Sequence, residues 1–130
     1  MANRSLKALS LLLVLGIVGA CSNAPLITRT SGTFNKQKYV VTLSAIPDGI
    51  NENAKLEIND TEILFIESAI YPNRDSNCVG SALSGWNCRY TSSYKGLPIS
   101  INRRIPVGGS GEYDVYLSDE FLANVRHSRR

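Results

Sequence analysis

The feature that most constrains the fold is a period-of-two alternation of apolar and polar residues, which recurs from residue 39 to near the C-terminus. Tyr39, Val41 and Leu43 share one phase, and residues 54–59 alternate Ala, Leu and Ile with Lys, Glu and Asn. Successive side chains of a β-strand point to opposite faces, so this period predicts strands with one buried face. Turn residues at 47–49 and at Asn59-Asp60 separate the strands and predict tight connections.

The later segments repeat this pattern with variations. Residues 63–66 are apolar on both phases, which predicts a central strand covered on both faces, with a short helix as the alternative. Four even-numbered residues are expected to share one strand face: Trp86, Cys88, Tyr90 and Tyr94. Five odd-numbered residues form the next inward phase: Leu97, Ile99, Ile101, Ile105 and Val107. Pro98 and Pro106 in that stretch indicate an edge strand or strand ends.

These segments predict an all-β fold, a small antiparallel sandwich or barrel of about six or seven strands. A short helical turn is expected near the C-terminus, where Ser118 would cap a segment with Phe121, Leu122 and Val125 on its apolar side. The order of the strands does not follow from the pattern.

The N-terminal segment has a different character. Residues 8–20 are apolar apart from one serine, and Arg4 and Lys7 precede them without any acidic residue. A helix over this run spans roughly 20 Å, less than the roughly 30 Å of a bilayer core. A core helix is disfavoured because the run has no polar face. The segment therefore predicts a cleaved export signal.

The end of this segment, Val18-Gly19-Ala20-Cys21, resembles the lipobox of bacterial lipoproteins. The resemblance covers residues 1–22 only, and it implies cleavage before Cys21, diacylglycerol on the Cys21 thiol and acylation of the new terminal amine. An ordinary signal peptidase site is the alternative. The resemblance also implies that this covalent lipid, palmitate included, anchors the protein to a membrane and that no other cofactor is bound. Enterobacterial inner-membrane lipoproteins commonly carry Asp after the cysteine, and this chain has Ser22 there. The resemblance therefore favours the periplasmic side of the outer membrane, with the cell surface or inner membrane as alternatives.

This interpretation divides the chain into a signal peptide (1–20), a lipidated flexible tether (21–38) and a β-rich periplasmic domain (39–130). Removing Arg4 and Lys7 from the 14 basic residues leaves 12 against 11 acidic residues, so the formal net charge falls from +3 to +1. A nearly neutral domain does not fit a nucleic-acid-binding protein, which needs a clustered excess of Lys and Arg.

The number of cysteines predicts one disulfide. The lipid on Cys21 leaves Cys78 and Cys88, which export would place in an oxidising compartment where a disulfide persists. The bridge closes a loop of about eleven residues and is expected to stabilise the domain by roughly 2 to 3 kcal/mol. A metal site is disfavoured because no histidine lies near the two thiols.

Few residues offer catalytic chemistry. The single histidine, His127, lies in the sequence NVRHSRR and is expected to be a solvated tail. Acidic residues gather between Asp48 and Glu67, where a Ca²⁺ site or a glycosidase carboxylate pair is one interpretation and a solvated surface the favoured one. The acidic set is Asp48, Glu52, Glu57, Asp60, Glu62 and Glu67. No enzyme activity and no metal site are therefore expected.

Basic residues dominate the following part of the chain: Arg74, Arg89, Lys95, Arg103 and Arg104, with Asp75 as the only acid among them. Arg103 is the unusual member because it shares the inward phase of Ile101 and Ile105. It is expected to be paired internally, displaced by a bulge or placed beyond the covered part of the sheet, with a ligand-facing guanidinium as the alternative.

The candidate partner-binding surface is the loop of residues 79–86 with the strand that follows it. Its residues are of types enriched at interfaces: Trp86, Arg89, Tyr90, Tyr94 and Lys95. Of the two alternatives for the aromatic residues, core packing against the disulfide is favoured over an interface.

The sequence thus predicts a membrane-anchored lipoprotein with a non-catalytic binding or assembly role in the cell envelope and a protein partner there. A component of a secretion, conjugation or envelope complex, or an exclusion factor, fits this description. The alternative is a periplasmic inhibitor of a cell-wall hydrolase such as lysozyme, by analogy with other small disulfide-bonded lipoproteins.

Overall fold

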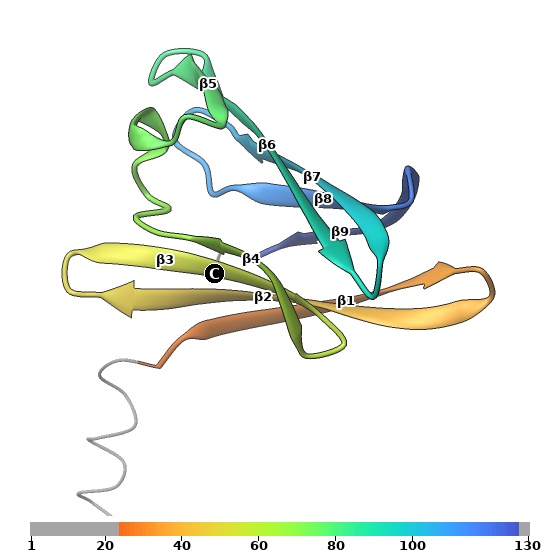
Figure 1. Cartoon of the computed structure of the whole chain (residues 1–130). Coiled ribbons are helices and arrows are strands. Elements are labelled where there is room, and N and C mark those ends of the chain that lie inside the picture. The colour runs from red at the N-terminus through yellow and green to blue at the C-terminus, as the bar shows by residue number, and fades with distance from the viewer. Residues whose placement is uncertain (1–23, 128–130) are drawn as a thin grey trace, which may run out of the picture.

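The computed structural model describes residues 24–127, which form two antiparallel β-sheets packed face to face (Figure 1). The four-stranded sheet, sheet A, runs β1 (Leu26–Phe34), β2 (Gln37–Asp48), β3 (Asn51–Ile58) and β4 (Thr61–Ile66). The five-stranded sheet, sheet B, runs β5 (Cys78–Ser81), β6 (Gly85–Tyr94), β7 (Leu97–Ile105), β8 (Glu112–Leu117) and β9 (Glu120–Arg126). Each sheet is a meander in which sequence neighbours pair, and this confirms the predicted all-β antiparallel sandwich. Residues 24–127 form nine strands, more than the expected six or seven.

Tight turns connect most of the strands. Both residues of four hairpin turns have positive φ: Asn35-Lys36, Asn59-Asp60, Lys95-Gly96 and Ser118-Asp119. Such turns match the right-handed twist of paired strands, and Asn and Asp tolerate the left-handed conformation better than most residues. The tight turn expected at Asn59-Asp60 is therefore confirmed.

The core lies between the sheets and is made of the inward phases of their strands. Sheet A contributes Val41, Leu43, Leu56 and Ile58 to the core, and sheet B contributes Ile99, Ile101, Val115 and Val125. The sheets approach most closely where β1 meets β9. A Cβ atom placed on Gly32 would lie 2.0 Å from the carbonyl oxygen of Leu122, so only glycine allows these two backbones to come so near.

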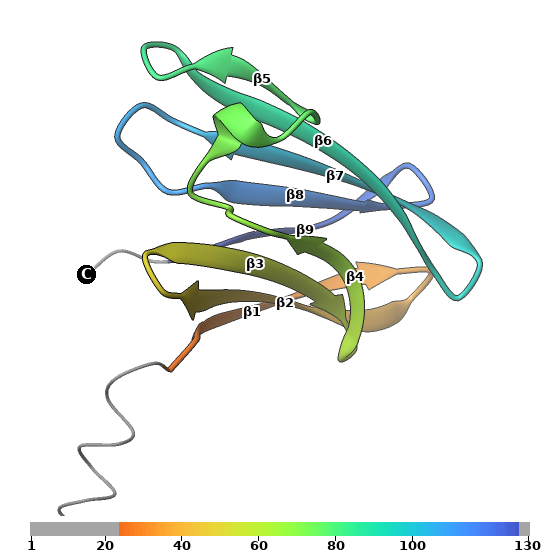
Figure 2. The ribbon, with the colours of Figure 1, turned by 60° about the vertical axis from the view of Figure 1, so that its left-hand side comes forward.

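On the other side of the sandwich, residues 67–77 cross from β4 to β5 and include a short 3₁₀ helix, Pro72–Arg74. Figure 2 shows this connection climbing from sheet A to sheet B. The start of β1, the β2–β3 hairpin, the 106–111 loop and the end of β9 lie at one common end of the sandwich in both views.

The expectation of a flexible tether through residue 38 is wrong for residues 26–38. Residues 26–34 form β1 and pair with β2 from Leu26 opposite Ala45 to Phe34 opposite Gln37. The strand was hidden in the sequence because β1 is an edge strand of its sheet, and most of its side chains face solvent. Cys21 and the signal segment lie outside the described residues.

Two further local expectations are corrected. Residues after Ser118 form β9 and not a helical turn, because Ser118 occupies a hairpin turn at φ 48° and does not cap a helix. The segment 63–66 lies in β4, which is an edge strand of sheet A and not a central one. Its Phe65 side chain is exposed, so the apolar run is covered on one face only.

None of the helical structure within residues 24–127 has the length and apolar character needed to cross a membrane.

Candidate functional site

The disulfide joins Cys78 of β5 to Cys88 of β6, as the cysteine count predicted. The two residues stand directly opposite each other on the paired strands, and their Cα atoms are 4.0 Å apart. The backbone N–H of Arg89 donates to the carbonyl of Asn77 at 3.1 Å, so Cys78 and Cys88 occupy the closer, non-hydrogen-bonded type of antiparallel pair. The bridge fastens the four-residue edge strand β5 to the sheet.

The loop between β5 and β6 is braced by its own side chains. The Oγ atom of Ser81 accepts hydrogen bonds from the backbone N–H groups of Leu83 and Ser84, at 3.3 and 3.1 Å. The hydroxyl groups of Ser81 and Ser84 lie 2.8 Å apart. The loop therefore holds its conformation without a partner, which reduces the entropy lost when such a loop binds.

This braced hairpin presents apolar side chains to solvent. Leu83 is 93% exposed and Val79 is 76% exposed. Figures 1 and 2 show the hairpin at the edge of sheet B farthest from sheet A. We call residues 78–88 the stapled hairpin.

The structure separates the residues predicted to form one partner-binding surface. Tyr90 and Tyr94 point into the core and are 8% and 4% exposed, so the alternative of core packing holds for both. Trp86 is half-buried and Arg89 is exposed. Lys95 lies in the turn after β6, about 30 Å along the strand from Trp86 at 3.3 Å per residue. Val79 and Leu83 lie in the loop of residues 79–86 that the sequence predicted as part of this surface, but the sequence did not single them out, because their exposure depends on the position of the hairpin in the fold.

Tyr90 forms a buried polar contact beneath the stapled hairpin. Its hydroxyl donates to Asp75 Oδ2 at 2.6 Å, and the backbone N–H of Asn77 donates to Asp75 Oδ1 at 2.9 Å. Burial by itself raises the pKa of Asp75, but these hydrogen bonds and the nearby charge of Arg103 together lower that pKa below its ordinary value. Burial, together with the bond to Asp75, raises the pKa of Tyr90. The hydroxyl is therefore a hydrogen-bond donor and not a base.

The acidic residues between Asp48 and Glu67 do not converge. Asp48 at the end of β2 and Asp60 in a turn are both exposed, and Glu57 pairs with Lys55 at 3.6 Å on the outer face. Within the part of the chain that the structure describes, no group of three or more metal-ligating side chains is close enough to hold an ion. Two members of this set border cavities: Glu67 lies at a hollow beside the crossover of residues 67–77, and Glu52 lies at a second cavity.

That cavity lies between the sheets at the end where β1 begins, and it has a volume of about 260 Å³. We call it the inter-sheet cavity. Its apolar wall comes from both sheets and from the crossover: Leu43, Ala45, Ala54, Ala69, Ile70, Pro72 and Ile105. Its polar groups come from Glu52, Arg103, Tyr113 and His127, and the 109–111 segment forms the remaining side.

Arg103 is the buried charge at this cavity, at 5% exposure. Its Nη2 atom donates to the carbonyl oxygen of Ala69 at 2.6 Å, and its guanidinium carbon lies 5.5 Å from the centre of the Tyr113 ring, with Tyr113 directly opposite it on β8. Of the structural interpretations, internal pairing is therefore the one observed. The guanidinium also lies close enough to the Tyr90 hydroxyl to oppose the rise in the pKa of Tyr90. The pairing is still incomplete, because neither Nε nor Nη1 makes a hydrogen bond of good geometry.

His127 is not the solvated tail that its position in the sequence indicated. Its Nδ1 atom lies 2.9 Å from Thr28 Oγ1 of β1, and its Nε2 atom is buried without a partner at the inter-sheet cavity. Burial lowers the pKa of His127, and the negative charge of Glu52 opposes this effect only in part. The imidazole is therefore neutral near pH 7.

These contacts give the chain two sites of different kinds, an exposed apolar hairpin and a cavity with unsatisfied donors. No model of a protein family matches the sequence, and neither the curated proteins nor the solved structures with which it was compared gave a match.

Proposed function

We propose that this chain is a lipid-anchored, non-catalytic binding protein of a bacterial envelope that captures a protein partner through the stapled hairpin. The observation that carries this proposal is the pair of exposed apolar side chains, Leu83 and Val79, on a hairpin held by the Cys78–Cys88 disulfide. Exposed apolar groups on a rigid scaffold are typical of contact surfaces, because a partner can bury them without first ordering the loop.

The lipid anchor rests on the N-terminal sequence. The basic residues, the short apolar run and Val18-Gly19-Ala20-Cys21 together support attachment through Cys21. A disulfide of two directly opposed cysteines agrees with export, since such bonds persist in oxidising compartments. Attachment through more than one acyl chain would hold the domain firmly at a membrane, whereas a single acyl chain binds the membrane reversibly. We place it at the periplasmic side of the outer membrane.

The anchor is tested by replacing the proposed lipid attachment residue. Cys21→Ala is expected to abolish labelling by radioactive palmitate and to leave an uncleaved or mislocalised precursor. Cys88→Ala serves as the matched control, because it removes a thiol elsewhere and should keep the label. Persistent labelling of the Cys21→Ala chain would refute the lipoprotein proposal.

The partner is tested by photo-crosslinking in living cells from a benzoylphenylalanine at position 83. Position 95 is the control, because Lys95 is also exposed but lies in the turn at the opposite end of β6. A discrete crosslinked protein at position 83, and none at position 95, is the expected result. Equal, diffuse crosslinking from both positions would contradict capture by the stapled hairpin.

The identity of the crosslinked protein separates the two kinds of binding role. A resident protein of an envelope complex supports assembly. A cell-wall hydrolase that is inhibited at near-stoichiometric ratio supports the inhibitor alternative, in which the hairpin would block a cleft. Hydrolytic activity of the purified chain that disappears in His127→Ala would overturn the non-catalytic proposal itself.

A further inference from the structure

The inter-sheet cavity contains a cation whose hydrogen-bonding capacity exceeds what the protein supplies. A guanidinium carries five N–H donors, and the three on Nε and Nη1 of Arg103 have no acceptor. Among residues 24–127 the ion pairs involve Lys55 and Arg104, and none includes Arg103. Burying a charged group without full pairing costs several kcal/mol, so a site that keeps it is suited to an anionic ligand.

The acids nearest to Arg103 do not complete its pairing. Asp75 is close enough for Arg103 to lower its pKa, but it forms no ion pair with Arg103, and its oxygens accept hydrogen bonds from Tyr90 and Asn77. Glu52 borders the cavity without forming an ion pair with Arg103. The charge of the guanidinium is therefore left without an ion-pair partner among residues 24–127, beside a partly apolar wall.

The shape of the enclosure limits the ligand. An engineered cavity of about 150 Å³ accommodates benzene, so a cavity of about 260 Å³ accommodates a group of roughly ten non-hydrogen atoms. Its wall is partly aliphatic, with Leu43, Ala45, Ala54 and Ile105 among the lining residues. A multiply charged anion would leave charge against this wall, whereas a single carboxylate on an apolar group matches both the wall and the cation.

Two further features of the wall fit this ligand. A Cβ atom at residue 111 would lie 3.0 Å from Arg103 Nε, so Gly111 keeps the approach to that donor open. The unpartnered Nε2 of His127 provides a second polar contact, and it is a donor when the Thr28 hydroxyl donates to Nδ1.

We propose that the inter-sheet cavity binds a small monocarboxylate with an apolar substituent, and that the guanidinium of Arg103 receives the carboxylate. This site is separate from the stapled hairpin and does not depend on lipidation, so the test of ligand binding is independent of the tests of the proposed function. The carboxylate can belong to a free aliphatic acid or to an apolar amino acid, whose ammonium group Glu52 is placed to meet at the same wall.

Isothermal titration calorimetry on the full chain, purified in detergent, tests the proposal with four probes. The probes are 4-methylpentanoate, leucine, the neutral isostere 4-methylpentanamide and inorganic phosphate. The amide is expected to bind about tenfold to a hundredfold more weakly than the better carboxylate, because hydrogen bonds between charged partners contribute about 1.5 to 3 kcal/mol. Tighter binding of leucine assigns the amino acid as the source, and tighter binding of 4-methylpentanoate assigns the free acid.

Variants locate the binding to Arg103. Arg103→Met is expected to abolish the preference for carboxylate over amide. Arg104→Met is the matched control, because Arg104 is the next residue on the opposite face and pairs with Glu112 at 2.8 Å and Asp114 at 3.0 Å. If Arg103→Met does not fold, Gly111→Ala gives a second measurement, since its methyl group obstructs Nε and should weaken carboxylate binding several-fold.

Three results would overturn the proposal. They are equal affinity for acid and amide, phosphate binding as tight as carboxylate binding, and no heat of binding from either carboxylate at millimolar concentration. Unchanged carboxylate affinity in a folded Arg103→Met chain would show that the carboxylate binds elsewhere, and would overturn it too.

Discussion

At the scale of single residues, the interior of this sandwich contains polar side chains that the alternation of apolar and polar residues does not predict. Arg103 lies on the inward phase of β7, flanked by Cys88 on β6 and Tyr113 on β8. The carbonyl of Ala69, which lies 34 residues earlier in the chain, accepts one of its hydrogen bonds. Burial raises the pKa of Tyr113, so its ring stays neutral beside the guanidinium.

Tyr90 and Asp75 form the other buried polar contact, and Tyr90→Phe tests its contribution to stability. Removing the hydroxyl leaves the 2.6 Å hydrogen bond to the Asp75 carboxylate unmade. The free energy of unfolding near pH 7 is expected to fall by about 1 kcal/mol, at the low end for a charged partner because Asp75 is partly solvated.

This loss should depend on pH in a defined direction. The folded-state pKa of Asp75 is lowered, so the stabilisation is fully present above the unfolded pKa of about 3.9 and is lost as the pH falls through the folded pKa. Urea denaturation of the wild type and of Tyr90→Phe should therefore give curves that differ near pH 7 and converge in strong acid. Ser92→Ala on the same strand is the control, and a difference that persisted unchanged in strong acid would contradict the assignment.

At the scale of elements, edge strands carry much of what distinguishes this fold. β5 has four residues and pairs with β6 alone, so it depends on the disulfide. β1 is held differently, by its pairing with β2 and by its close approach to β9 at Gly32. Of the four edge strands, β5 is thus held by a covalent bond and β1 by close backbone packing.

The double variant Cys78→Ala/Cys88→Ala tests the disulfide. It is expected to lower the free energy of unfolding by roughly 2 to 3 kcal/mol, because the bridge no longer restricts the unfolded chain. Local opening should accompany this loss, with faster amide hydrogen exchange in β5 than in the wild type. The amides of β2, in the centre of sheet A, provide the internal control, and an unchanged exchange rate in β5 would show that the strand does not need the bridge.

At the scale of the whole molecule, the start of β1 fixes how near the domain lies to its proposed anchor. Leu26 already belongs to the sheet, so five residue steps separate Cys21 from the folded domain. At about 3.4 Å per residue these steps reach at most about 17 Å. The end of the sandwich that includes the β2–β3 hairpin would then face the membrane.

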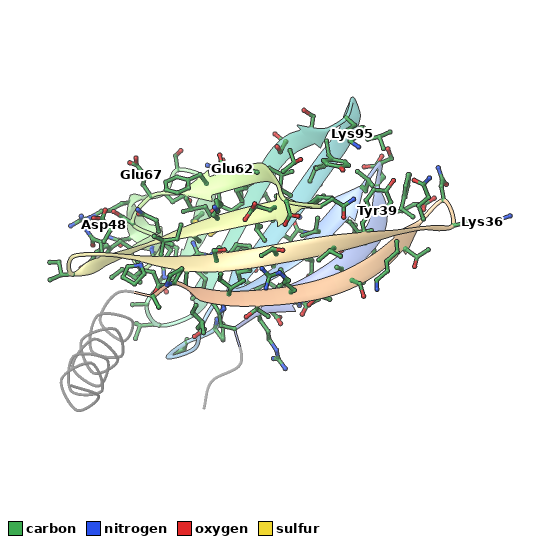
Figure 3. The ribbon with its side chains drawn as sticks, turned by 90° about the horizontal axis from the view of Figure 1, so that it is seen from below. Lys36, Tyr39, Asp48, Glu62, Glu67 and Lys95 are labelled. Carbon is green, nitrogen blue, oxygen red and sulfur yellow. A yellow bond between two sulfur atoms is a disulfide. The ribbon has the colours of Figure 1, made fainter. Side chains whose placement is uncertain are left out.

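Spin labels at the two ends of the sandwich test this orientation in membrane-bound protein. Figure 3 shows Asp48 at one end of the sandwich and Lys36 and Lys95 at the other. A label at position 48 is expected to collide with a lipid-soluble relaxation agent more often than a label at position 95. The same pair of labels in detergent-solubilised Cys21→Ala protein is the control. Equal collision rates in the membrane sample would contradict a domain held close to the bilayer by its end.

The inner strands and the disulfide could be predicted from the sequence because their causes are local. Period-two alternation and the Asn59-Asp60 turn act within a few residues, and Cys78 and Cys88 are the two cysteines among the described residues, so each has only the other as a partner there. The strand β1 and the turn at Ser118-Asp119 could not be predicted so well. Strand β1 is polar because its outer face meets water. The turn begins with Ser118, and serine is equally typical of a helix cap.

The sequence by itself determined the all-β character of this protein, the phase of its core side chains and its one disulfide, since each depends on neighbouring residues or on a single pair. The tertiary structure decided which edges meet, where the stapled hairpin stands and what surrounds Arg103. Those outcomes depend on contacts between residues far apart in the chain, such as Arg103 with Ala69 and Thr28 with His127. The inter-sheet cavity exists only because these distant segments converge at one end of the sandwich, and no local pattern specifies that convergence.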